Sequence, residues 1–263
     1  MFFLIPMATM FSLSLQEGTL ESGYRFTAHW QTYVDALGSY DKQLIRSLAY
    51  GLIATLATLA ISYPMAYWIA LHGGRRKNLY LLLILLPFFT PFIIRTLSWK
   101  FILADNGILL GNLKEWGLLG GEYQVLATQT AVLAGLIYNF LPFMALPLYV
   151  ALERLDPSML DAANDLYSNR RQTFLRVTLP LSLPGVFAGS LLTFIPAVGD
   201  FLNSELLGSV NTTMIGQVIQ REFLVNNDYP EGAALSFLLM AGVLGLVFMY
   251  TRAIGNTEEL TGG

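Results

Sequence analysis

The stretch that decides the fold is residues 125–150, which read VLATQTAVLAGLIYNFLPFMALPLYV and contain no charged residue. A helix needs about 20 mostly apolar residues to cross the hydrocarbon core of a bilayer, because each residue advances it by about 1.5 Å. Lipid offers no partner for backbone polar groups, so such a stretch is stable there as a helix. We therefore predict that this segment is a transmembrane helix.

Similar stretches lie on both sides of this segment. Two apolar stretches precede it: residues 48–71 carry no charge, and residues 79–103 carry only Arg95 and Lys100. Two uncharged stretches follow it, at 179–199 and 233–251. An apolar segment at the N-terminus is shorter than a comfortable crossing, so its helix is short or truncated. The sequence predicts an all-α integral membrane protein with a single transmembrane domain over 1–263 and six spans, at about 1–15, 48–71, 79–103, 125–150, 179–199 and 233–251.

The composition of the whole chain agrees with a membrane protein. Of its 263 residues, 54% are hydrophobic and 13% are charged, whereas soluble domains carry about 25% charged residues. The net charge of −3 gives no reason to expect nucleic-acid binding. The absence of Cys excludes disulfides, thiolate metal sites and Cys nucleophiles.

The motifs of common enzymes are missing from the sequence. It contains no Gly-x-Gly, no phosphate-binding G-x-x-x-x-G-K-[ST] loop and no G-x-S-x-G elbow. Its two histidines, His29 and His72, fall on opposite sides of the predicted membrane. We therefore predict that the chain is not an enzyme and has no catalytic or metal-binding residues and no cofactor of its own.

Several proline and glycine residues lie within the predicted spans. Proline removes a backbone donor and can kink a helix, and it occurs here at Pro64, Pro87, Pro91, Pro142, Pro147, Pro184 and Pro196. Two spans with paired prolines favour helices that bend. Gly185 and Gly189 form a small-xxx-small pair, which allows a neighbouring helix to approach closely.

Basic residues predict which loops face the cytoplasm. Cytoplasmic loops hold an excess of Lys and Arg, and two short loops on the same side of a six-span chain are basic. They contain Arg75, Arg76 and Lys77, and then Arg154, Arg170, Arg171 and Arg176. We expect a multi-pass protein with both termini in the cytoplasm.

The second basic loop, residues 152–178, contains a predicted short helix. Asp156 is a good N-cap and Pro157 suits the first helical position. Apolar residues follow at helical spacing, and two acids lie one turn apart on another face. A helix that lies on lipid prefers a basic polar face, so this one favours a protein partner. The apolar residues are Met159, Leu160, Ala163 and Leu166, and the acids are Asp161 and Asp165.

This loop resembles a known family. Asp161-Ala162-Ala163, then Tyr167 and then Val177-x-Leu179-Pro180 resemble the EAA-x3-G-x9-I-x-L-P loop of ABC importer permeases with the MetI-like type I fold. The resemblance implies that the loop is a coupling helix seated in a cleft of an ATPase subunit. It assigns this role to Asp161, Ala162, Ala163, Asp165, Leu166 and Tyr167, with Arg170 and Arg171 flanking.

The loop departs from the family pattern at three positions. Asp161 stands in place of Glu and Val177 in place of Ile, which are mild changes. Tyr167 replaces a Gly that supplies backbone freedom, and Tyr is strained at positive φ. Either the helix continues through Tyr167 or the ATPase cleft is unusual.

The resemblance extends over residues 44–250 and is strongest to PotB-type spermidine/putrescine permeases. Runs that carry it include Ile94-Arg95, Leu141-Pro142-Phe143-Met144 and Asp228-Tyr229-Pro230. It implies a bacterial inner-membrane importer for polyamines. The implied partners are a PotC-like second permease, a PotA-like ATPase dimer that holds ATP and Mg, and a PotD-like extracytoplasmic binding protein.

A polyamine path needs carboxylates for the ammonium groups and aromatic faces for cation–π contacts. Asp200 and Glu205 follow the fifth span, and Trp99 and Tyr138 lie on neighbouring spans; we predict that these four line the path. The carboxylates could instead be helix-end charges or partners of Arg95 or Lys100, and the aromatics could be packing or interface residues.

Three other functions remain open at this point. The first is the same importer class with another solute, such as thiamine, iron or an opine. The second is an ion-driven secondary transporter, for which inverted repeats and acids inside the spans are expected. The third is a scaffolding membrane subunit.

Overall fold

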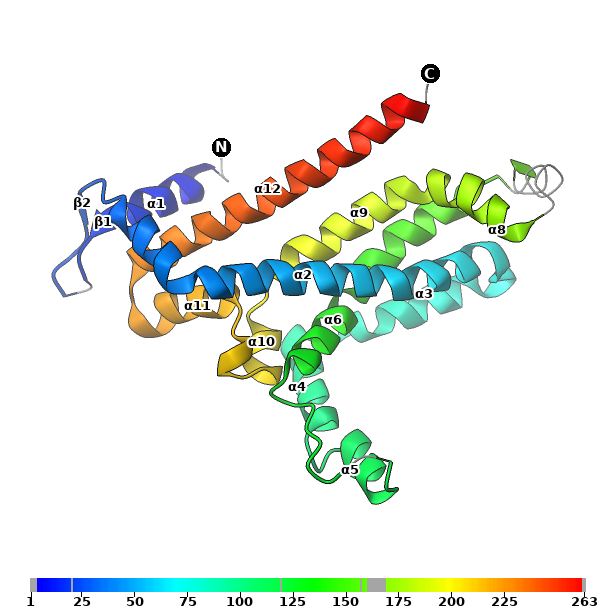
Figure 1. Cartoon of the computed structure of the whole chain (residues 1–263), viewed down its shortest axis with the longest axis horizontal. Helices are drawn as coiled ribbons and strands as arrows, with labels where there is room; N and C mark the ends of the chain where they lie inside the picture. Colours follow the sequence, from blue (N-terminus) through cyan, green and yellow to red (C-terminus); the bar gives the residue numbers. More distant parts are fainter. Residues whose placement is uncertain (1–3, 20, 119, 157, 160–168, 262–263) are drawn as a thin grey trace. The chain divides into compact units, whose positions relative to one another are not determined.

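The computed structural model describes residues 4–261 except 20, 119, 157 and 160–168, with the side chains of Arg170 and 253–261 outside the description. The chain forms two compact units (Figure 1). One unit comprises Met1–Tyr50 and Val198–Gly263, and the other comprises Gly51–Ala197. Helix α2 contributes its first part to one unit and its second part to the other.

The unit Gly51–Ala197 is built from helices. Its core is formed by α2 and α6, where Ala66, Ile69 and Ala70 pack with Met144 and Leu148. The elements of this unit are the second part of α2 (Gln31–His72), η1 (Gly74–Arg76), α3 (Lys77–Leu85), η2 (Leu86–Phe89), α4 (Phe92–Leu103), α5 (Ile108–Glu115), α6 (Gln129–Glu153), α8 (Arg170–Thr173), η3 (Phe174–Thr178) and α9 (Leu179–Val198).

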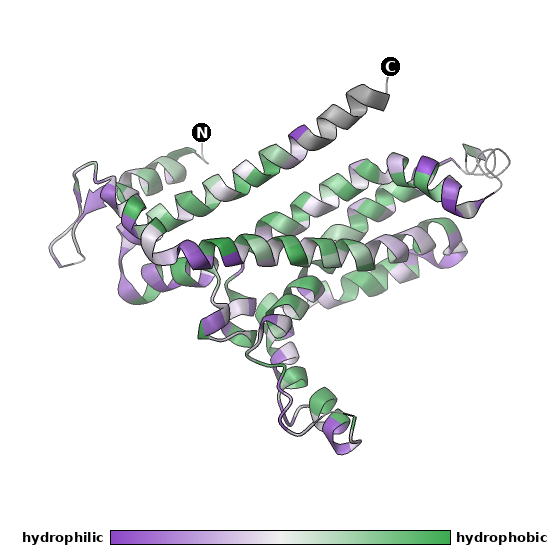
Figure 2. Ribbon diagram, viewed as in Figure 1, coloured by the Kyte–Doolittle hydropathy of each residue, from purple (hydrophilic) through white to green (hydrophobic). Residues whose placement is uncertain are grey.

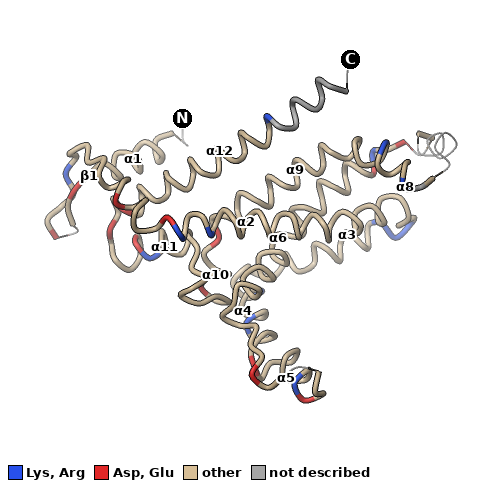
Figure 3. Tube along the Cα trace, viewed as in Figure 1, with Lys and Arg blue, Asp and Glu red and all other residues tan. Residues whose placement is uncertain are grey.

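The deciding stretch forms a helix as predicted. Helix α6 begins after Thr128, whose hydroxyl oxygen accepts the backbone N–H of Ala131 at 3.4 Å. Such a cap satisfies one of the free donors of the first turn. Figure 2 shows apolar residues along most of α6 and α9, and Figure 3 shows both helices without charge over most of their length.

Close packing of α9 against α6 confirms the prediction from the small-xxx-small pair. A Cβ built on Gly185 would lie 2.5 Å from Ala151 Cβ and 2.8 Å from the Pro147 carbonyl oxygen. A Cβ on Gly189 would lie 2.8 Å from Met144 Sδ. Only glycine fits at these two positions without a shift of the neighbouring helix.

The third predicted span is not one straight helix. The segments Gly74–Phe89 and Phe92–Glu115 meet at an angle of 92°. Thr90 is extended and Pro91 precedes the first residue of α4. The bend follows from the chemistry of proline, which lacks a backbone donor and disfavours helical backbone at the residue before it.

The other unit is also mainly helical. Its core is formed by Ala36, Leu44, Ile215, Val218 and Leu235. Its elements are α1 (Leu4–Ser14), β1 (Gln16–Glu17), β2 (Arg25–Phe26), the first part of α2, α10 (Leu202–Leu207), η4 (Val210–Thr212), α11 (Ile215–Arg221), η5 (Glu222–Asn226) and α12 (Tyr229–Thr261). The two-residue strands β1 and β2 pair antiparallel, with Gln16 opposite Phe26, and are a small addition to the predicted all-α fold.

The predicted helical membrane fold is confirmed, but the count of six spans is not reproduced in the described residues. Four helices are long and apolar enough to cross a membrane, and the bent pair makes up to five. The first predicted span forms α1, which has only 11 residues and packs on α12 through an edge contact of Phe11 with Phe237. An 11-residue helix is about half the length of a crossing.

Candidate functional site

The predicted coupling helix falls mostly outside the described residues, which applies to Asp161, Ala162, Ala163, Asp165, Leu166 and Tyr167. Its predicted beginning is described. Asp156 Oδ1 accepts the backbone N–H of Ser158 at 2.9 Å, and this hydrogen bond lowers the pKa of Asp156. After the loop, Arg170 begins α8, and the side chain of Arg171 is exposed. Asp156 therefore has the local geometry of a helix cap, as predicted.

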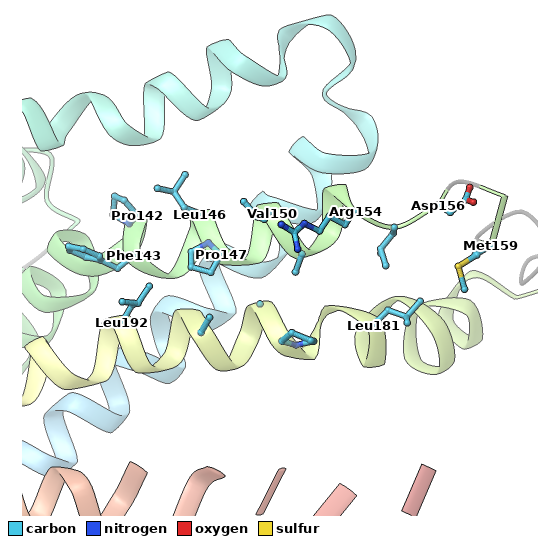
Figure 4. A pocket seen from close by; sticks show the side chains of 15 residues that line it. Pro142, Phe143, Leu146, Pro147, Val150, Arg154, Asp156, Met159, Leu181 and Leu192 are labelled. Carbon is cyan, nitrogen blue, oxygen red and sulfur yellow. The ribbon is translucent and has the colours of Figure 1, made fainter. Parts of the chain in front are cut away.

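An apolar groove of about 710 Å³ lies between α6 and α9 (Figure 4). Its walls include Pro142, Phe143 and Leu192, and Gly185 lies at a close approach of the two helices. At the other end it is lined by residues that lead into the loop, among them Arg154, Asp156 and Met159. The groove thus connects two apolar helices with the beginning of the predicted coupling helix.

The two predicted carboxylates differ in their surroundings. Asp200 is only 8% exposed, and its Oδ1 accepts the backbone N–H of Asn203 at 2.8 Å. Burial raises the pKa of Asp200 to about 6, although the hydrogen bond from Asn203 opposes this effect. Glu205 lies one turn further along α10 and is exposed. Asp200 therefore holds the start of α10, while the Glu205 side chain is exposed.

A buried polar cluster joins α10 to α11 and to the segment before it, and the sequence analysis did not predict this cluster. The hydroxyl of Ser204 accepts the backbone N–H of Met214 at 3.0 Å and lies 3.0 Å from Gln217 Oε1. Gly216 of α11 approaches Gly199, because a Cβ at Gly216 would lie 2.3 Å from the Gly199 carbonyl oxygen. Ser, Gln and Gly separated by loops leave no periodic pattern, so no sequence signal marks them.

The two predicted aromatic residues are in contact. The rings of Trp99 and Tyr138 meet edge to face, with centroids 5.4 Å apart. Beside them, Asn139 Nδ2 donates to the buried hydroxyl of Thr96 at 3.1 Å, which joins α6 to α4. The structure brings this pair together in one unit and places both predicted carboxylates on or beside α10 in the other unit.

Metal binding has no visible basis in the described part of the chain, where no three His, Asp or Glu side chains gather as ligands. His29 Nδ1 contacts Glu17 beside β1 in one unit, and His72 ends α2 in the other.

Apolar helices long enough to cross a membrane, a bent span and a loop with basic flanks are the features of a multi-pass membrane protein. Residues 62–254 match the family described as binding-protein-dependent transport system inner membrane component. The chain belongs to this family of inner-membrane permease subunits of ABC importers.

Two curated relatives and one solved structure are similar to this chain. The spermidine/putrescine transport system permease protein PotB of Haemophilus influenzae is 38% identical over 96% of this chain and 88% of the relative. The protein of the same name from Escherichia coli is 41% identical over 81% and 78%, respectively. One chain of a bacterial ABC transporter involved in the import of the acidic polysaccharide alginate matches with a TM-score of 0.69 at 17% identity, covering 96% of this chain and 89% of that chain. The last likeness supports the fold alone.

Proposed function

We propose that this chain is the PotB-like permease of an ATP-driven polyamine importer. The single observation that carries the proposal is the identity of 38% over 96% of the chain to a spermidine/putrescine permease. In the proposed assembly a PotC-like permease completes the membrane domain, a PotA-like dimer supplies ATP hydrolysis, and a PotD-like protein delivers the solute. The alginate transporter crystallised with its periplasmic protein supports such an arrangement at the level of the fold.

In this proposal the loop 152–178 transmits closure of the ATPase dimer to the spans. The acids Asp161 and Asp165 with the flanking Arg171 form the docking face, and the groove between α6 and α9 begins at Asp156. Because Gly185 holds α9 tightly against α6, movement of the loop would be carried into both helices. The prolines in these helices supply the places where they bend.

The proposed path uses the two pairs of residues differently. Glu205 is exposed and would contact an ammonium group directly, whereas Asp200 would act through α10, whose first turn it holds. The contacting rings of Trp99 and Tyr138 would offer their faces to the alkylammonium chain. Carboxylates and aromatic faces are the groups that a flexible polycation needs.

The proposed orientation places the two basic loops in the cytoplasm. With α1 counted as a short first crossing, both termini lie there as well. Lys77, at the start of α3, lies 3.5 Å from Glu153 at the end of α6, so the two basic loops flank the same end of this unit. Figure 3 shows basic residues gathered there. An excess of Lys and Arg is typical of the cytoplasmic side.

The proposal is tested by reconstituting the chain in proteoliposomes with its sister permease, ATPase and binding protein. We expect spermidine or putrescine on the binding protein to stimulate ATP hydrolysis and uptake, and thiamine to have no effect. Stimulation by thiamine alone would keep the importer class and exclude the polyamine assignment. Uptake that needs no ATP would contradict the coupling role of the loop.

A charge reversal tests the loop within the same preparation. Asp161→Lys should separate ATP hydrolysis from uptake, because it inverts the proposed docking face. Lys42→Asp reverses an exposed charge on the first part of α2 and is the matched control. Unchanged coupled turnover in Asp161→Lys would exclude this residue from coupling.

A further inference from the structure

Arg95 is a buried cation inside the apolar unit. Its side chain is 8% exposed on α4, just after the bend in the third span. None of the ion pairs among the described residues involves it, and its Nε has no hydrogen-bond acceptor. A buried charge without a counter-ion is costly, and inside a membrane span it indicates function.

Two aromatic rings hold the guanidinium of Arg95. Its Cζ lies 4.5 Å from the centroid of Phe88 and 5.5 Å from that of Phe92. At these distances a cation is attracted by the negative face of a ring. Phe88 precedes the bend and Phe92 follows it, so one side chain spans both arms of the broken helix.

The two rings are fixed from behind by α6. Phe88 meets Phe143 edge to face at 5.2 Å, and Phe92 packs on Phe140 at 6.2 Å. Rings held in this way keep their faces in place when the group above them changes. The four rings and Arg95 therefore form a preorganised cation site that this structure fills with a residue of the chain itself.

The cation site lies on the same helix, α4, as Trp99 of the proposed path. Trp99 lies one helical turn after Arg95 on α4, and Tyr138 lies on α6 next to the buried Thr96–Asn139 contact. A solute that carries several ammonium groups needs more than one such site. Phe92 lies on α4 as Trp99 does, and Phe88 lies on η2 just before the bend.

We propose that Phe88 and Phe92 form a subsite for an alkylammonium group, and that Arg95 determines its specificity by occupying the ring faces until the solute displaces it. The proposal rests on the proposed function as a polyamine permease. Displacement is possible because the guanidinium leaves a hydrogen bond unmade where it lies, and it gains acceptors when it turns toward water.

Equilibrium binding of radiolabelled spermidine tests the subsite. The importer is reconstituted in lipid nanodiscs without its binding protein, so that only the membrane domain and ATPase are present. Arg95→Met keeps the apolar stem and leaves the two ring faces free. We expect this variant to bind spermidine about 2- to 20-fold more tightly, because this is the change in affinity to which the energy of a cation–π contact corresponds. Arg95→Lys keeps a cation but not the planar stack, and should lie between Met and wild type.

A double variant separates the subsite from a general effect of charge. Phe88→Leu in the Arg95→Met background removes the ring face and should abolish the gain. Phe101→Leu is the control, because Phe101 is on the same helix, is 72% exposed and makes none of the ring contacts in the described residues. A gain that survives Phe88→Leu would overturn the subsite.

The remaining outcomes are also decisive. Unchanged binding by Arg95→Met would overturn the proposal, and if this variant fails to assemble, unchanged binding by Arg95→Lys would do so. Stimulation of wild-type ATPase by spermidine-loaded binding protein is measured in parallel. A stimulated wild type with unaltered binding in the variants rejects the subsite alone, whereas an unstimulated wild type rejects the proposed function and the subsite together.

Discussion

Asp200 and Arg95 are two buried charges with equal exposure and opposite surroundings. Each is 8% exposed, and each lies at a break between helical segments. Asp200 accepts a backbone N–H from the helix that it precedes. Arg95 has two ring faces and no acceptor for its Nε.

In our proposal, this difference separates a charge that stabilises the start of a helix from a charge that acts on the solute. A carboxylate that accepts a backbone N–H from the first turn of a helix offsets part of the desolvation cost of its burial. The buried Nε of Arg95 has no such partner, so its hydrogen-bonding capacity is not satisfied locally. Burial by itself therefore does not identify a functional residue, whereas the partners of the buried group do.

The largest expected effect tests how tightly the surroundings of Asp200 are packed. Gly216→Ala would place a Cβ 2.3 Å from the backbone oxygen of Gly199, so the backbone must shift. We expect a loss of about 3 kcal/mol in the free energy of unfolding, measured by thermal and denaturant unfolding in detergent. Gly199→Ala meets nothing within 4 Å and should change it by less than about 0.5 kcal/mol. Equal effects would show that this region is loosely packed.

The second effect tests the charge of Asp200. Its pKa is about 6 in the folded protein and about 3.9 in an unfolded chain. The folded state therefore holds the proton more tightly between these values, and stability falls as pH rises from 4 to 6 and stays lower above.

An uncharged isostere of Asp200 should remove this pH dependence. Asp200→Asn keeps an oxygen for the Asn203 N–H, so we expect it to exceed wild type by on the order of 2 kcal/mol at pH 7.5 and to match it at pH 4. Unfolding midpoints at several pH values measure this difference. Glu205→Gln, an exposed change on α10, should follow wild type. A parallel pH curve for Asp200→Asn would contradict the burial argument.

The smallest expected effect concerns the stability of the Arg95 region. Replacing a buried charge by an apolar group of similar length is often neutral or stabilising. We expect Arg95→Met to change the free energy of unfolding by less than about 1 kcal/mol, in contrast to its effect on spermidine binding. Lys100→Met, an exposed change on the same helix, is the reference. A loss of several kcal/mol would show that Arg95 stabilises the fold, and its retention would then need no role in solute binding.

Much of the molecule could be predicted from local sequence. Uncharged runs of about 20 residues predicted the helices at 129–153 and 179–198, because lipid leaves the backbone no alternative. Gly185 and Gly189 predicted the close approach of α9, and the ring contact of Trp99 with Tyr138 fits their assignment to neighbouring spans. The loop pattern from Asp161 to Pro180 predicted the family before any comparison.

Other features depended on contacts between distant parts of the chain. The prolines indicated a bend near Pro91, but hydropathy alone gave 79–103 as one span, because it is insensitive to the direction of a helix. The cluster of Ser204, Met214 and Gln217 depends on loops that bring separate segments together.

The sequence by itself determined that this protein is a helical membrane protein, because the length and apolarity of each span are local properties, and the loop pattern from Asp161 to Pro180 pointed to the permease family. Only the tertiary structure decided which of the two buried ionisable side chains, Asp200 and Arg95, has a hydrogen-bond partner. Asp200 and Arg95 look alike in the sequence as ionisable residues near the ends of apolar helices. Their roles diverge because a backbone N–H meets one and aromatic faces from both arms of a bend meet the other.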